Sequence, residues 1–325
     1  MIVDVHAHLF PPALVERLPI PPSIGDVPGM LAAKAAAGID LTIVGSPTGA
    51  STMAAAGGQS LAELASYHDW LAETVQAHPD RLRAYAWCDP FGGDGMLADV
   101  NALLATEEFA GVIVNPSIGG KDIADPAADE FLAMVAASGK PMLLHSGADP
   151  LCTRELTDYG LIEMVGRFCD VTLGLAALCL SGQLERHPDL VVVGTSCGAG
   201  LPLLPSRLDL AWAPRHWGGR SRPGTAPRSS HTGPRRSITA PSELMRRLYV
   251  DTTTDSPHLL RAAVDLLGPE HVLFGSDAPP VPVDHGARIG MVRSLGLGEE
   301  ATGLMLGGNA QRLYGIRSSV PAGRA

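Results

Sequence analysis

The sequence predicts an α/β fold, a single-domain (β/α)8 TIM-like barrel, and three features of the chain indicate it. Eight short, mostly continuous apolar segments recur along 325 residues, and nearly every one is followed by a helical pattern. Continuous apolar strands are buried on both faces, as parallel strands are. Alternating strands and helices produce right-handed crossovers and a parallel sheet. Eight repeats in a chain of this length favour one closed barrel.

The predicted elements follow one another from the first residues onward. The first strand begins at Ile2 and leads to His8, and the other strands span 41–46, 82–87, 111–116, 141–145, 190–195, 248–252 and 271–277. Helices are predicted over 29–38, 61–78, 96–105, 127–138, 161–169, 172–187, 203–212, 258–267, 287–294 and 299–306. An open doubly wound sheet is the alternative, but no Gly-x-Gly-x-x-Gly turn follows the first strand.

The composition excludes several classes of protein. Hydrophobic residues make up 46% and charged residues 18%, which is typical of a globular chain. A formal charge of −10 argues against nucleic-acid and membrane-surface partners. No signal-peptide pattern and no apolar run of about 20 residues is visible. The five cysteines have no Cys-x-x-Cys spacing. We therefore expect a cytoplasmic protein without a disulfide scaffold.

One segment departs from the strand–helix rhythm. Residues 213–240 contain six arginines, many Pro, Gly and Ser residues and no acidic residue. We predict an irregular insertion after the sixth strand of a barrel that spans 1–317, followed by a flexible tail over 318–325. The insertion is either a lid whose guanidinium groups bind a carboxylate or phosphate, or a solvated loop without a role.

Polar side chains at three strand ends predict a metal site. His6 and His8 lie two residues apart at the end of the first strand, where alternation puts them on one face with Asp4. His145 ends the fifth strand and Asp277 the eighth. All strands of a parallel barrel end at one mouth, where three imidazoles and a carboxylate would hold one zinc-like ion and leave a position for water. Taken singly, each residue has a plainer explanation, such as a core histidine or a helix cap.

At these residues the chain resembles the amidohydrolase superfamily, in particular the group that includes aminocarboxymuconate-semialdehyde decarboxylase and the resorcylate-type decarboxylases. The matching stretches are residues 4–11, 111–116, 140–145, 181–190, 248–252 and 271–279, which cover nearly the whole chain outside the insertion and the tail. The resemblance implies that His6, His8, His145 and Asp277 ligate one divalent ion, with Zn2+ expected, and that the protein is a homodimer. The fourth strand ends on Asn115 and not on a lysine, so a second ion is not expected.

The sequence departs from this group after the sixth strand. Ser196 stands where members usually have a histidine, and Ala199 stands where the resorcylate-type branch has a glutamate. A serine does not supply a proton near neutral pH as an imidazole does. The neighbouring Cys197 is either a thiol available to the site or a buried structural thiol.

Three functions remain open from the sequence. The favoured one is hydrolysis of a small cyclic or acylated, carboxylated substrate by metal-activated water, with Asp277 and His145 as catalytic residues. The alternative is a nonoxidative decarboxylase or hydratase that acts on a small unsaturated or aromatic acid, with Asp89, Asp251 or Cys197 as the acid. Asn115 and Ser196 are further candidates for substrate contact or for support of the metal ligands. The third is an inactive barrel that serves as a binding subunit, which the four intact ligands disfavour.

Overall fold

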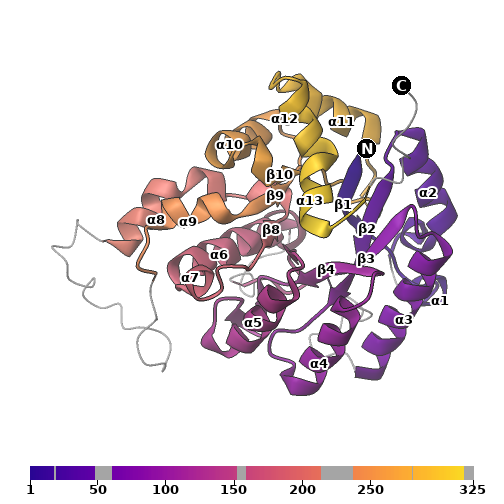
Figure 1. Ribbon diagram of the computed structural model, residues 1–325, viewed down its shortest axis with the longest axis horizontal. Coiled ribbons are helices and arrows are strands. Elements are labelled where there is room, and N and C mark those ends of the chain that lie inside the picture. Colours follow the sequence, from indigo (N-terminus) through magenta and orange to yellow (C-terminus); the bar gives the residue numbers. More distant parts are fainter. Residues whose placement is uncertain (18–19, 48–60, 152–158, 214–236, 280, 318–325) are drawn as a thin grey trace.

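The computed structural model describes all residues except 18–19, 48–60, 152–158, 214–236, 280 and 318–325. Eight parallel strands form one sheet in the order β1-β2-β3-β4-β7-β8-β9-β10, and helices surround it (Figure 1). The strands are β1 Val3–His8, β2 Leu41–Gly45, β3 Leu82–Trp87, β4 Phe109–Val114, β7 Met142–Leu144, β8 Val192–Gly194, β9 Tyr249–Asp251 and β10 Val272–Leu273. The predicted (β/α)8 barrel is confirmed.

Backbone hydrogen bonds between the first and last strands close the barrel. The amide of Val5 donates to the carbonyl of Phe274 (2.9 Å), and the amide of Asp277 donates to the carbonyl of His6 (2.8 Å). The last strand is regular only over Val272–Leu273, although we predicted it to Asp277. Beyond Leu273 the chain continues beside β1, and at the end of this continuation Asp277 adopts a positive φ of 63°. This turn keeps Asp277 beside β1 at the mouth.

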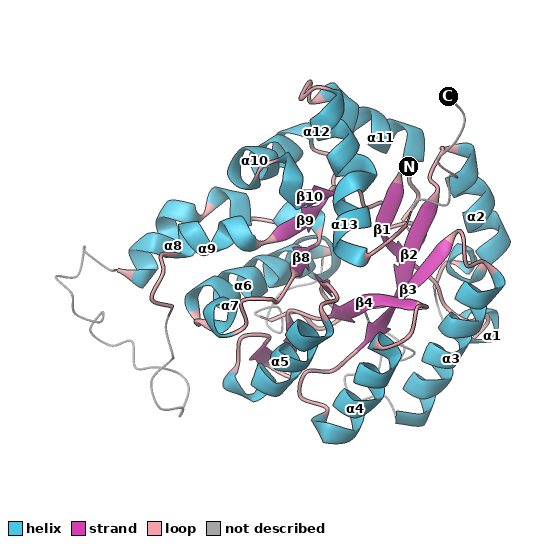
Figure 2. Cartoon of the chain, viewed as in Figure 1, coloured by secondary structure: helices cyan, strands magenta, loops and turns pink. Residues whose placement is uncertain are grey.

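Helices form the outer layer of the barrel (Figure 2). They are α1 Pro12–Val15, α2 Val27–Ala36, α3 Leu61–Ala77, α4 Gly93–Leu104, α5 Asp129–Ser138, α6 Arg167–Leu180, α7 Gln183–Arg186, α8 Pro205–Trp212, α9 Pro241–Leu244, α10 Pro257–Leu267, α11 His285–Ser294, α12 Glu299–Gly303 and α13 Asn309–Tyr314. Side-chain caps begin several of them: Asp26 accepts from the amide of Gly29, and Asp284 from that of Ala287. No helix in the described part of the chain is long and apolar enough to cross a bilayer.

Several elements differ from the prediction, among them the short helices α1 and α9, which were not predicted. The helix predicted over 172–187 is broken because Gly182 has a φ of 76°, so α6 ends at Leu180 and α7 follows as a single turn. A short hairpin, β5 Ser117–Ile118 and β6 Lys121–Asp122, follows β4 and turns through two glycines with positive φ. The last helix, α13, was missed, and a π-helical segment over Leu304–Gly308 joins it to α12.

Most of the predicted insertion and the whole predicted tail lie outside the described residues. Of residues 213–240, only Ala213 and 237–240 are described. Ser237 is buried beside α6, where its amide donates to the carbonyl of Leu180 (2.9 Å). The lid and the solvated-loop hypotheses for the arginine-rich segment therefore stay predictions.

Candidate metal centre

Four predicted side chains meet at the carboxyl ends of β1, β7 and β10. The ligand atoms of His6, His8, His145 and Asp277 all lie within 4.8 Å of one another. Asp277 Oδ1 is 2.8 Å from His8 Nε2, 3.3 Å from His6 Nε2 and 3.9 Å from His145 Nε2. The three imidazoles are buried, whereas Asp277 keeps 27% of its side chain exposed. Asp277 is therefore the member of the cluster that solvent reaches most.

Each imidazole is oriented by a hydrogen bond from its other nitrogen. Nδ1 of His6 bonds Asp251 Oδ2 (2.5 Å), Nδ1 of His8 bonds the carbonyl of Gly45 (3.1 Å), and Nδ1 of His145 bonds the carbonyl of Ser146 (2.9 Å). The three rings are nearly perpendicular to one another, at 86–89°. Acceptors at Nδ1 fix the tautomer that exposes the Nε2 lone pair, which is how metal-binding histidines are held in proteins. The donor set fits one divalent cation.

The cluster is strongly coupled electrostatically. Burial lowers the pKa of His6, but Asp277 and Asp251 outweigh it and raise the pKa to about 10. Burial raises the pKa of Asp277, yet the charge of His6 and hydrogen bonds from the imidazoles hold it well below its usual range. Burial lowers the pKa of His145 to about 3. A cation bound at Nε2 of His6 therefore competes with a proton for that nitrogen.

Asp251 and Asn115 support the metal ligands from behind. Asp251 is fully buried and accepts a hydrogen bond from Nδ1 of His6. It also accepts from the backbone amide of Thr253 (2.9 Å) and from the hydroxyl of Thr253 (3.0 Å). Asn115 Nδ2 donates to the carbonyl of His145 (2.9 Å), while its Oδ1 accepts from the indole of Trp87 (3.3 Å). Both candidates from the sequence lie beside the site and contact its ligands directly.

The turn after β8 contains Ser196, Cys197 and Ala199, which all adopt positive φ between 54° and 58°. Cys197 is fully buried, and burial, with Asp251 nearby, raises the pKa of its thiol well above the usual range. Ala199 is fully buried as well, whereas Ser196 is half-buried. Of the two interpretations of Cys197, the structure favours the buried structural thiol. Ser196 is the polar residue of this turn that solvent reaches.

Two predicted residues have other partners. Asp89 accepts from the amide of Phe91 (2.8 Å), which organises the loop after β3, and it is not part of the cluster. Asp4 does not share the surroundings of His6 and His8, because the register of β1 against β2 shifts between Asp4 and Ala7. Asp4 instead pairs with Lys34 of α2 and accepts from the hydroxyl of Ser276 (2.7 Å). The expectation of one shared face was wrong for Asp4.

Arg167 and Asp170 on α6 were not singled out in the sequence. Arg167 Nη2 donates to the carbonyl of Ser146 (3.1 Å), the same oxygen that orients His145, and its positive charge contributes to the lowered pKa of His145. Asp170 accepts from the hydroxyls of Ser117 (2.7 Å) and Ser146 (3.0 Å). In the sequence, the only indication was that Arg167 and Asp170 are oppositely charged and lie three residues apart in a predicted helical region. This spacing does not predict the hydrogen bond from Arg167 to the carbonyl of Ser146.

Comparison with known proteins finds several decarboxylases among its matches, together with solved structures described only as amidohydrolases. A 2-amino-3-carboxymuconate-6-semialdehyde decarboxylase of Dictyostelium discoideum is 21% identical over 260 residues, covering 79% of this chain and 68% of that protein. The crystal structure of a 5-carboxyvanillate decarboxylase from Sphingomonas paucimobilis superposes with a TM-score of 0.78 at 22% identity, covering 97% of this chain and 99% of that one.

A second solved structure is a dihydroxybenzoic acid decarboxylase from Polaromonas sp. JS666 with bound manganese and the inhibitor 2-nitroresorcinol. It superposes on this chain with a TM-score of 0.77 at 19% identity, and the match covers 97% of this chain and 96% of the Polaromonas chain. At these identities the structural matches establish the shared barrel. A family model described as Amidohydrolase matches residues 3–316, nearly the entire chain, and the protein therefore belongs to the amidohydrolase family.

Proposed function

We propose that this protein is a metal-dependent nonoxidative decarboxylase of a small aromatic or unsaturated carboxylic acid. The observation that carries the proposal is the convergence of His6, His8, His145 and Asp277 in a chain whose curated relative is a decarboxylase. Hydrolysis was favoured from the sequence, but the comparisons do not support it, and the decarboxylase alternative fits them better.

A divalent ion at this site would bind an oxygen of the substrate and draw electron density away from the bond to be broken. In decarboxylation the electron pair of the carbon–carboxylate bond stays on the substrate carbon, CO2 leaves, and a proton takes its place. The protein must therefore hold the anion and deliver one proton to carbon.

Asp277 is the residue that we assign to proton transfer. It is the member of the cluster with the most exposed side chain, so it borders the space from which substrate arrives. As a carboxylate it has the acceptor oxygens to take a proton from bound water or a substrate hydroxyl and then return it to carbon. Buried Cys197 and Ala199 offer no such group, which supports Asp277 over the turn after β8.

Arg167 supports an anionic substrate. Its side chain is 24% exposed, pairs with Glu163, and donates to the carbonyl that orients His145. A guanidinium at the edge of the site attracts a carboxylate and holds it through forked hydrogen bonds. His145, a ligand and our second catalytic candidate, would then act through the cation that it binds.

A product-resolved assay tests this function. The protein is loaded separately with Zn2+ and Mn2+ and incubated with hydroxybenzoic acids, carboxylated dienoic acids, lactones and cyclic amides, while CO2 and ring-opened products are measured. We expect CO2 in stoichiometric yield from at least one acid. Hydrolysis of a lactone or amide without CO2 release from any acid would refute the proposal. The same assay decides between zinc, our prediction, and manganese, while the predicted homodimer is checked by light scattering.

A further inference from the structure

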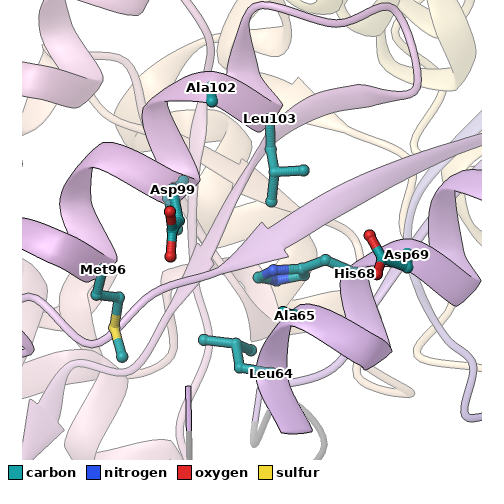
Figure 3. A pocket seen from close by; sticks show the side chains of 9 residues that line it. Leu64, Ala65, His68, Asp69, Met96, Asp99, Ala102 and Leu103 are labelled. Carbon is teal, nitrogen blue, oxygen red and sulfur yellow. The ribbon is translucent and has the colours of Figure 1, made fainter. Parts of the chain in front are cut away.

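A pocket opens between α3 and α4 on the outer layer of the barrel, lined by residues that do not belong to the metal cluster (Figure 3). Its volume is about 250 Å3. Its apolar wall is formed by Leu64, Met96, Val100 and Leu103. A space of this size holds a compact organic molecule of about ten non-hydrogen atoms.

His68 lies on the inner side of this pocket and extends from α3 into the space between the helices (Figure 3). Only 4% of the residue is exposed. The backbone amide of Trp87 donates to His68 Nε2 (3.0 Å), so this nitrogen is an acceptor and the ring proton is on Nδ1. Burial lowers the pKa of His68 to about 4, which keeps the ring neutral.

Nδ1 of His68 has no hydrogen-bond partner among the described residues. This nitrogen is not among the fully buried polar atoms that lack a partner, so water in the pocket reaches it. A small molecule that displaces this water keeps the hydrogen bond only if it brings an oxygen or nitrogen acceptor of its own. The side chain thus indicates one feature of the occupant.

The rim of the pocket indicates a second feature. Asp69 of α3 and Asp99 of α4 are exposed and lie at its opening, one from each helix (Figure 3). Among the described residues that line the pocket there is no lysine or arginine. Two carboxylates around an apolar space favour a cation and repel an anion, although at an exposed rim the effect is modest.

We propose that the α3–α4 pocket binds a compact organic amine whose apolar body carries a hydrogen-bond acceptor at the end remote from the ammonium group. The acceptor takes the Nδ1 proton of His68, the body packs against Leu64 and Leu103, and the ammonium lies between Asp69 and Asp99. This site is separate from the decarboxylase function proposed above, and either can fail without the other.

Trp87 gives the site a direct reporter. Its backbone amide donates to His68, and its indole donates to the carbonyl of Pro47 (2.9 Å) and to Asn115, which holds the carbonyl of the metal ligand His145. A ligand that bonds to His68 Nδ1 changes the acceptor strength of Nε2 and therefore the chemical shift of the Trp87 amide.

The experiment titrates three probes into the full-length, metal-loaded protein and follows the Trp87 amide by 15N NMR. Tyramine has the ammonium, ring and phenolic oxygen that the site calls for. Phenethylamine lacks the oxygen, and 4-hydroxyphenylacetate replaces the ammonium with a carboxylate. We expect tyramine to bind with a dissociation constant on the order of 1 mM, phenethylamine several-fold more weakly, and the acid not measurably.

Variants separate the pocket from unspecific binding. Ala65 lies at the opening, so Ala65→Trp should fill it and weaken tyramine binding at least about tenfold without touching the Trp87–His68 bond. Ala98→Trp, an exposed change on α4 outside the pocket, is the matched control and should leave the affinity unchanged. Equal affinity for all three probes, equal affinity of the two tryptophan variants, or no saturable shift of the Trp87 amide would overturn the proposal.

Discussion

Strand β1 takes part in two buried polar networks that differ in one respect. Around Asp4, the partners are within the protein: Lys34 pairs with it, and the amides of His6 and Ser276 donate to its Oδ1 at 3.1 and 3.0 Å. Around His6 and His8, the Nδ1 atoms are bonded, but the Nε2 atoms converge on one another and on Asp277. The first network is satisfied by the fold, whereas the second directs its Nε2 atoms and the Asp277 carboxylate at one point where a cation can bind.

This difference separates stability from function. Removing a member of a self-satisfied buried network leaves an unpaired charge and destabilises the fold. Removing a member of a convergent network removes a ligand for a cation and relieves crowding among like groups, so the fold loses little. The register of β1 against β2 shifts between Asp4 and Ala7, within the stretch that joins the two networks.

The largest expected effect comes from breaking the convergent network. His145→Ala should lower turnover about 10³-fold or more and reduce bound metal from one ion per chain to a trace, because a ligand to the cation is lost. Elemental analysis and the decarboxylation assay measure both quantities. The melting temperature of the metal-free variant should stay close to that of the metal-free parent. His258→Ala, an exposed change on α10, is the control, and full metal content in His145→Ala would contradict the assigned site.

The next effect comes from breaking the self-satisfied network. Lys34→Met should lower the free energy of unfolding by about 3 kcal/mol, because it leaves the Asp4 carboxylate buried without its ammonium partner. Urea unfolding measures the change. Adding Asp4→Asn should recover part of the loss, since it removes the unpaired charge and keeps an acceptor for Ser276. Lys121→Met, an exposed lysine, should cost less than about 1 kcal/mol, and an equal loss in both lysine variants would refute the distinction.

His68 combines both situations, since Nε2 is paired within the fold and Nδ1 is not. Its pKa of about 4 lies below the ordinary value of 6.5, so between these values the unfolded chain binds the proton that the folded chain excludes. The contribution of neutral His68 to the free energy of unfolding is fully present above pH 6.5 and is lost as the pH falls toward 4. Between pH 7 and pH 5 the free energy of unfolding falls by about 2 kcal/mol for this reason.

His68→Gln keeps an acceptor for the Trp87 amide but does not titrate. The variant should therefore lose less stability than the parent when the pH falls from 7 to 5, and denaturant unfolding at both values measures the difference. His258→Gln serves as the exposed control. Parallel pH profiles for His68→Gln and the parent would show that His68 takes up its proton in the folded state as easily as in the unfolded one.

The barrel and the four cluster residues could be predicted because their signals are local. Each strand is a short apolar run, and His6, His8, His145 and Asp277 stand at the ends of such runs, which a parallel barrel brings to one mouth. The partner of Asp4 could not be predicted, because a bulge in β1 moves it out of the alternation and Lys34 approaches from a helix. Likewise, the bond of Arg167 to the Ser146 carbonyl depends on how α6 packs over the end of β7.

The smallest expected effect concerns Ser196, which stands where the family resemblance of the sequence led us to expect a histidine. Ser196→Ala should keep turnover within about tenfold of the parent value. The side chain of Ser196 is half-buried, and the turn is defined by the positive φ angles of its backbone, which alanine can also adopt at this position, as Ala199 does in the same turn. Measurements of kcat and KM with the decarboxylation substrate test this.

Ser196→Val separates the hydroxyl from the backbone, because a β-branched side chain is strained at a φ of 55° and should lower stability where alanine does not. Ser196→His should not raise turnover, since buried Ala199 provides no carboxylate to orient the new imidazole. A loss of about 10²-fold or more in Ser196→Ala, at unchanged metal content, would instead mean that this hydroxyl holds substrate or a proton-carrying water. Proton transfer would then involve the turn after β8 as well as Asp277.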